Sequence, residues 1–369
     1  MSDPTRAAEP ASDPSAADTS TQVGPEASAD PGPPRVPVSV LDLATVRPEE
    51  GIRAAFEASV ELAQAAERWG YTRYWFAEHH NMATIASSAT SVLITHIAEH
   101  TSTIRVGAGG IMLPNHSPLV IAEQFGTLET LFPGRIDLGL GRAPGGDMAM
   151  LRSLRRRPED SDRFPQDVAE LQLLLGPPDP EHAVRAVPGT GTEVPLFILG
   201  SSLFGAQLAA RLGLPYAFAS HFAPAALTEA VSTYRREYVP SPQHPEPYVI
   251  AGVNAFVADT EDEAAQWHQA ALRQMVIRLA RRGVELSEAD ADAILATPHG
   301  DQVRQMARHT LVGSPSSIPA QAAQFARHAQ ADELIVASNA PSTQARYRTY
   351  DLLAQALDLP GRGGIPASA

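Results

Sequence analysis

Short apolar segments alternate with amphipathic segments along most of this chain, and this alternation restricts the folds that the chain can adopt. The apolar segments, which are predicted strands, are residues 38–43, 71–77, 104–109, 135–140, 194–199, 216–219, 248–257 and 333–337. The predicted helices are residues 48–69, 88–99, 117–131, 165–175, 203–212, 225–238 and 343–357. Because strands that alternate with helices form parallel sheets, the pattern predicts an α/β protein, a (β/α)8 barrel with insertions. A doubly wound open sheet is the alternative architecture.

Three segments do not fit the alternation. Residues 1–35 are rich in proline and acidic residues and nearly lack large apolar side chains, which predicts a disordered N-terminal tail. The barrel is expected over residues 36–358, with a helical insertion at about 260–310, because that stretch is longer than one crossover needs. Residues 359–369 are predicted to form a flexible C-terminal tail.

The first predicted helix carries signals at both ends. Pro48 suits the first helical turn, where the missing amide hydrogen has no partner to lose. Apolar residues from Ile52 to Trp69 recur at helical spacing, and Gly70 suits a left-handed cap after them. Further along, the arginine-rich residues 151–163 are predicted to form a loop.

Composition excludes several classes of function. The 369 residues include no cysteine, which excludes disulfides, thiolate metal sites and a cysteine nucleophile. A net charge of −14 argues against nucleic acid as a partner. No apolar run is long enough to cross a membrane and no secretory signal is visible, so a cytoplasmic protein with no membrane partner is expected.

The strongest candidate for chemistry is the sequence Glu78-His79-His80, which follows the second predicted strand. A barrel holds its catalytic residues at the C-terminal ends of its strands. Histidine has an ordinary pKa close to neutral and can therefore move protons. Because adjacent residues of an extended chain point in opposite directions, one histidine is expected to point into a pocket. The alternative is a polar strand end whose histidines bond to the backbone.

Other ionisable residues follow predicted strands, but their spacing matches no known ligand set. They are Asp42, His116 and His221. Zinc sites draw three or four ligands from defined positions. The sequence analysis therefore predicts no metal site.

A glycine-rich segment, Gly107-Ala108-Gly109-Gly110, ends the third predicted strand. Glycine permits conformations and close contacts that a side chain would block. The segment is therefore expected to approach a flat ligand closely or to contain an unusual peptide geometry. A simple bulge or turn is the alternative.

Two motifs suggest an anion site. Arg142 follows the fourth predicted strand among small residues, which suits a phosphate or a flavin carbonyl; a surface pair with Asp147 is the alternative. Gly200, Ser201 and Ser202 precede a predicted helix, whose first amides attract anions. The alternative here is an ordinary serine cap. A later serine cap, at Ser314 or Ser317, is interpreted as structural.

Together these motifs resemble those of the bacterial luciferase-like flavin-dependent monooxygenases, in the non-luminescent oxidoreductase subgroup. The resemblance extends from residue 36 to about residue 357. It is carried by residues 77–80, 106–118, 133–135, 139–142, 200–202, 311–315 and 331–334. It departs from the luciferases at Gly141, where they have a cysteine.

The resemblance implies a barrel that binds reduced FMN (FMNH2) and activates dioxygen to oxygenate a small-molecule substrate. His79 is then the catalytic histidine, with Glu78 and His80 as supporting catalytic residues. The family's non-prolyl cis peptide falls within Ala108-Gly109-Gly110, beneath the flavin. The phosphate contacts fall on Arg142 and on Gly200, Ser201 and Ser202.

The resemblance also implies partners and leaves alternatives. NAD(P)H is expected as the ultimate electron donor, directly or through a separate flavin reductase, and the protein is expected to be a homodimer. The same barrel serves deazaflavin-dependent hydride transfer, which is the first alternative. A catalytically silent flavin-binding protein and a metal-dependent hydrolase built on the histidines are the others.

Overall fold

The computed structural model of the protein describes residues 36–47, 49–143, 145–280 and 286–361. The tail predicted at 1–35, residues 362–369 of the tail predicted at 359–369, and the helix start predicted at Pro48 lie outside the described residues.

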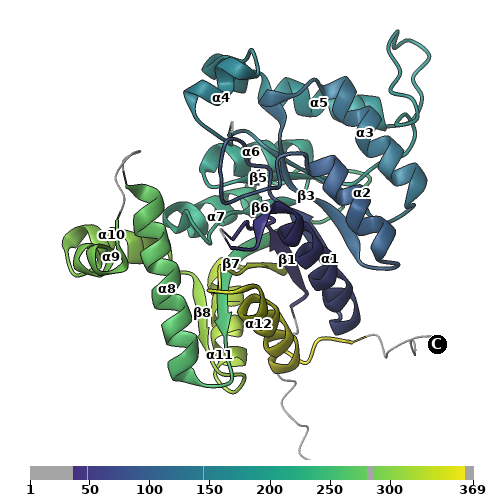
Figure 1. The fold of residues 1–369 in the computed structure, drawn as a ribbon. Coiled ribbons are helices and arrows are strands. Elements are labelled where there is room, and N and C mark those ends of the chain that lie inside the picture. Colours follow the sequence, from purple (N-terminus) through teal and green to yellow (C-terminus); the bar gives the residue numbers. More distant parts are fainter. Residues whose placement is uncertain (1–35, 48, 144, 281–285, 362–369) are drawn as a thin grey trace, which may run out of the picture. The chain divides into compact units, whose positions relative to one another are not determined.

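Within the described residues, parallel strands close into a barrel, as the alternation predicted (Figure 1). The barrel strands are β1 (Val38–Asp42), β2 (Arg73–Phe76), β3 (Arg105–Met112), β4 (Ile136–Gly141), β5 (Leu196–Gly200), β6 (Tyr216–Phe218), β7 (Val249–Val257) and β9 (Glu333–Ala337). Their order is β6-β5-β4-β3-β2-β1-β9-β7, and the pairing of β6 with β7 closes the ring. This closure excludes the open sheet.

Helices cover the outside of this barrel. They are α1 (Gly51–Trp69), α2 (Thr90–His100), α3 (Pro118–Leu131), α5 (Phe164–Leu175), α6 (Leu203–Leu212), α7 (Leu227–Glu237), α11 (Ile318–Ala329) and α12 (Thr343–Ala356). Helix α1 ends as predicted, because Gly70 adopts a left-handed conformation with φ of 88°. Among the helices of the described chain, none has the length and apolar character needed to cross a membrane.

The segment expected to be a helical insertion forms α8 (Glu261–Leu279), α9 (Glu288–Leu295) and α10 (Pro298–Met306). These helices share a small apolar core that includes Leu272, Val276, Leu295 and Val303. In Figure 1, α9 and α10 lie beside one end of α8.

A further strand, which the sequence analysis did not predict, follows the helical segment. Strand β8 (Thr310–Gly313) pairs with residues 254–257 of β7, beyond the part of β7 that pairs with β6. Its four residues are too short for a periodic pattern to be recognised. Ser317 does precede α11, but its side chain makes no capping hydrogen bond.

The arginine-rich segment is more ordered than the predicted loop. It is occupied in part by α4 (Met148–Ser153) and by the 3-10 helix η2 (Pro158–Arg163). The other 3-10 helices of the described chain are η1 (Leu113–Asn115) and η3 (Pro224–Ala226). Asp147 caps α4 by accepting a hydrogen bond of 2.9 Å from the amide of Met150.

The two ends of the barrel interior differ in chemistry. Near the N-terminal ends of the strands, Arg73 is paired with Asp137 at 2.8 Å and with Glu333 at 2.9 Å. Both carboxylates are fully buried. Apolar side chains such as Trp75 and Phe197 pack in the interior. This filling leaves the C-terminal ends of the strands, here called the mouth, as the place for a site.

Candidate functional site

The residues singled out from the sequence follow or end neighbouring strands at the mouth. Glu78, His79 and His80 follow β2; Ala108, Gly109 and Gly110 lie in β3; Arg142 follows β4; Gly200 ends β5, and Ser201 and Ser202 come next. Because β2, β3, β4 and β5 are consecutive neighbours in the barrel, these segments lie along one side of the mouth.

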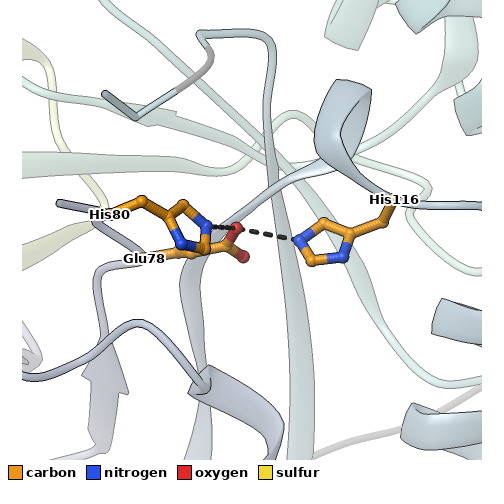
Figure 2. A group of neighbouring side chains, drawn as sticks. All are labelled: Glu78, His80 and His116. Atoms are coloured by element: carbon orange, nitrogen blue, oxygen red, sulfur yellow. Dashed lines mark hydrogen bonds and ion pairs between the residues drawn. The ribbon is translucent and has the colours of Figure 1, made fainter. Parts of the chain in front are cut away.

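Glu78 is the centre of a hydrogen-bonded cluster at this side of the mouth. Its side chain is 1 % exposed, and Oε1 lies 2.7 Å from Nε2 of His80 and 2.8 Å from Nε2 of His116. The amide of Met112 donates to Oε2 at 3.2 Å. Figure 2 shows the two imidazoles approaching the carboxylate from different sides. An ionised carboxylate only accepts hydrogen bonds, so both imidazoles donate from Nε2.

The charge of Glu78 is maintained by these donors. Burial raises the pKa of Glu78, but the hydrogen bonds from His116 and His80 outweigh burial and hold the pKa below its ordinary value of 4.5. Glu78 is therefore an ionised acceptor that joins the end of β2 to the segment after β3. From the sequence, His116 is recognisable only as a strand-end residue, because nothing in its spacing points to Glu78.

The same cluster has a composition that metal sites use. Glu78, His80 and His116 each offer one ligand atom, and these atoms lie within 4.8 Å of one another. Catalytic zinc sites are built from three such ligands and a water. The absence of a metal therefore stays a prediction, which metal analysis of the purified protein tests.

His79 has different surroundings from His80, as expected for adjacent residues of an extended segment. Its Nδ1 is buried and has no hydrogen-bond partner within the described part of the chain. Burial lowers the pKa of His79 below its ordinary value of 6.5, and the nearby carbonyl of Ala77 offsets burial only in part. The ring is therefore neutral near pH 7.

The end of β3 contains the unusual peptide geometry that its glycines suggested, together with an irregularity in its pairing. The peptide bond between Gly109 and Gly110 is cis, and the register with β4 shifts between Ala108 and Ile111. A Cβ on Gly110 would lie 2.7 Å from the carbonyl oxygen of Gly139, so the strands approach too closely for a side chain. Ala108 and Gly110 are buried, whereas Gly109 between them is partly exposed.

Arg142 does not pair with Asp147, the alternative considered from the sequence. Its Nη2 lies 3.2 Å from Oδ1 of Asp162, and its guanidinium lies 4.3 Å from the centroid of the Phe204 ring. Phe204 is the second residue of α6, so the arginine lies beside the start of that helix. Its side chain remains 41 % exposed.

The start of α6 has donors to offer. Ser202 occupies the N-cap position with an extended backbone but makes no side-chain capping hydrogen bond. Ser201 and Ser202 are both exposed. The first amides of a helix have no partners within the helix and attract anions. Arg142 and this helix start therefore form a cationic corner suited to a phosphate.

Asp42, another strand-end residue, belongs to the structure that holds the barrel together. It is fully buried, forms an ion pair of 2.7 Å with Arg346, and accepts a hydrogen bond of 2.6 Å from Ser59. Tyr74 also donates to it. Its carboxylate is therefore engaged by α1, β2 and α12 rather than offered to a ligand.

Comparison with known proteins shows a family and a fold that this chain shares. The family model described as luciferase-like monooxygenase matches residues 36–332. A protein of Escherichia coli strain K12 named luciferase-like monooxygenase is 46% identical over 320 residues, which cover 85% of this chain and 95% of that protein. The solved structure of apo-MsnO8 has a TM-score of 0.81 and 36% identity, covering 89% of this chain and 99% of that chain.

More distant structures share the fold alone. A Type II Baeyer-Villiger monooxygenase from Pseudomonas putida, in complex with FMN, has a TM-score of 0.64 at 16% identity over 88% of this chain and 98% of that chain. An F420-dependent secondary alcohol dehydrogenase has a TM-score of 0.62 at 14% identity over 88% and 99%. Both kinds of cofactor thus occur on this barrel.

Proposed function

Because the chain belongs to the luciferase-like monooxygenase family, and is therefore an enzyme of this class, we propose that it oxygenates a small organic substrate with reduced FMN and dioxygen. The reaction takes place at the mouth of the barrel. The observation that carries this proposal is the position of Arg142 at the start of α6, 4.3 Å from the Phe204 ring.

Two groups of residues at the mouth suit two parts of FMN, the phosphate and the flat ring. The flavin phosphate would bind to Arg142 and to the helix start formed by Gly200, Ser201 and Ser202. Arginine forms charge-assisted hydrogen bonds to phosphate, and the first amides of α6 add donors. The flat ring would lie on the backbone of Ala108, Gly109 and Gly110, where close approach is possible because two of these residues lack a Cβ.

FMN, when bound and reduced, supplies the electrons and the activation of dioxygen. His79 holds or releases a proton at its imidazole during oxygen transfer, since its ring is neutral near pH 7 and Nδ1 has no partner in the described structure. Glu78 supports His79 by holding the end of β2 to Met112 at the end of β3 and to His116 after it, and His80 donates to the same carboxylate.

Electrons reach the site from NAD(P)H, through a separate flavin reductase or directly. The proposal also includes a homodimer in the cytoplasm. These parts rest on the family alone, so they are tested by reconstitution with a flavin reductase and by the mass of the protein in solution.

Deazaflavin-dependent hydride transfer is the competing function, because an F420-dependent dehydrogenase shares the fold. The experiment is an anaerobic titration of the protein with reduced FMN and, separately, with reduced F420, followed by rapid mixing with air-saturated buffer. The proposal expects reduced FMN to bind, and the bound flavin to pass through a transient absorbing species before it is oxidised. Binding of F420 without binding of FMN would overturn the proposal, and immediate oxidation of bound FMN would favour a silent flavin-binding protein.

The role of His79 is tested in the same assay. His79→Ala should bind reduced FMN within about twofold of the original protein but should lose product formation with any substrate found in a screen. His96→Ala on the outer helix α2 is the matched control and should retain activity. Unchanged turnover in His79→Ala would remove this residue from the mechanism.

A further inference from the structure

The turn after β6 carries an imidazole that the proposed function does not use. His221 follows this strand at the mouth, and β6 lies opposite β2 in the closed barrel. Two side-chain hydrogen bonds fasten the turn to β7. Oγ of Ser220 donates to the carbonyl of Gly252 at 2.6 Å, and Nδ2 of Asn254 donates to the carbonyl of His221 at 2.6 Å. The backbone on either side of the imidazole is therefore held in place.

Gly252 provides the space that this imidazole occupies. A Cβ on Gly252 would lie 2.4 Å from Nδ1 of His221 and 3.2 Å from its Cε1. Gly252 is inside the nine-residue strand β7 and has no left-handed φ, so its conformation does not require glycine. Glycine weakens the interior of a strand. Glycine at this position therefore leaves room for the His221 ring and for the backbone carbonyl of Phe218, from which a Cβ would lie 3.2 Å.

His221 and His79, which follow strands on opposite sides of the mouth, each have a buried ring nitrogen without a partner in the described structure. In both rings this nitrogen is Nδ1. Burial, reinforced by the charge of His79, lowers the pKa of His221 to about 4. Buried polar atoms without partners are uncommon and call for an explanation such as a bound ligand.

We propose that His221 is a second imidazole of the site, which lies across the mouth from His79 and contacts the flavin ring bound between them. This inference rests on the proposed function, because it requires a ring that extends from the glycine-rich end of β3 across the mouth. Nδ1 of His221 is buried against Gly252, so Nε2 is the nitrogen through which this imidazole contacts such a ring. His221 thus supplies a polar contact from the side opposite His79, where the sequence analysis placed none.

The test uses the full-length protein with histidine side chains labelled for NMR and titrated anaerobically with reduced FMN. The signals of His79 and His221 are identified by their loss in His79→Gln and His221→Gln. Both signals should move when FMN binds. The control is His244, which also has a buried ring nitrogen without a partner in the described structure but lies before β7, at the other end of the barrel. Its signal should not move.

Binding constants provide the second readout. His221→Phe should bind reduced FMN about fivefold more weakly, which corresponds to the loss of one neutral hydrogen bond. His221→Gln, which keeps a hydrogen-bonding group, and His244→Gln should remain within about twofold. Unchanged affinity in His221→Phe, or a His221 signal that stays in place while His79 moves, would overturn the inference and leave the proposed function intact. Failure of the original protein to bind reduced FMN would overturn both.

Discussion

Nε2 of His116 lies 2.8 Å from Oε1 of Glu78, although 38 positions separate the two residues along the chain. This contact, together with the one from His80, gives a buried carboxylate two charge-assisted hydrogen bonds. The contact between Glu78 and His116 joins the end of β2 to the segment after β3. Strand β3 itself contains the cis peptide. The position of the neighbouring His79 therefore depends on a residue that is remote in sequence.

Removal of this carboxylate should destabilise the protein. Glu78→Ala leaves His80, His116 and the amide of Met112 without their acceptor, which should lower the free energy of unfolding by about 2 to 4 kcal/mol. Urea unfolding at pH 7 measures this change. The control is Glu57→Ala. Glu57 forms a solvent-exposed ion pair with Arg53, so its loss should change the free energy of unfolding little. Equal stability of the two variants would contradict the role assigned to Glu78.

Arg142→Ala should weaken binding of reduced FMN by at least tenfold, because a charge-assisted bond to phosphate is lost. Arg304→Ala is a matched control, since Arg304 has similar exposure and pairs with Asp301 at 2.7 Å on α10. Fluorescence or absorbance titration under anaerobic conditions measures both affinities. Equal affinities in the two variants would place the phosphate elsewhere.

Stability should depend on the protonation of His221. Its pKa in the folded protein is about 4, below the ordinary value of 6.5, so the unfolded chain binds a proton in that interval while the folded chain does not. This contribution is therefore fully present above pH 6.5 and is lost as the pH falls toward 4. Integrated over the shift, the loss is on the order of 3 kcal/mol.

The measurement is urea unfolding of the original protein and His221→Gln at several pH values between 7.5 and 4. The original protein should lose more stability on acidification than His221→Gln, whereas His299→Gln, at an exposed position of α10, should behave like the original protein. Parallel curves for all three proteins would show that His221 titrates normally.

The glycines of β4 should differ sharply in their tolerance of alanine. A Cβ on Gly139 would lie 2.2 Å from the carbonyl oxygen of Ala108, and backbone cannot move aside easily. A Cβ on Gly141 would lie 3.1 Å from the sulfur of Met112, at the far end of a flexible side chain. Gly139→Ala should therefore lower the free energy of unfolding by about 1 to 3 kcal/mol or more, and Gly141→Ala by much less. Similar melting temperatures for the two variants would contradict the close approach of β4 to β3 at Gly139.

Much of the fold could be predicted because its signals are local. The apolar strands and the stripe of α1 repeat within a few residues, and the left-handed cap at Gly70 depends only on its neighbours. Strand β8 was missed because Thr310–Gly313 is too short to show a period and depends on pairing with β7. The helices α4 and η2 were not predicted, because this segment is rich in charged residues. They are stabilised by capping hydrogen bonds at their N-terminal ends, from Met150 to Asp147 and from Arg157 to Asp160.

The candidate site divides in the same way. By itself, the sequence determined that histidines, glycines and an arginine follow strands whose ends meet, because strand period and chain order are written in consecutive residues. Only the tertiary structure decided that Glu78 binds His80 and His116, that Asp42 binds Arg346, and that Arg142 lies on Phe204. Apart from the contact between Glu78 and His80, these contacts join residues far apart in the chain, and they form only once barrel closure brings the strand ends and helices together.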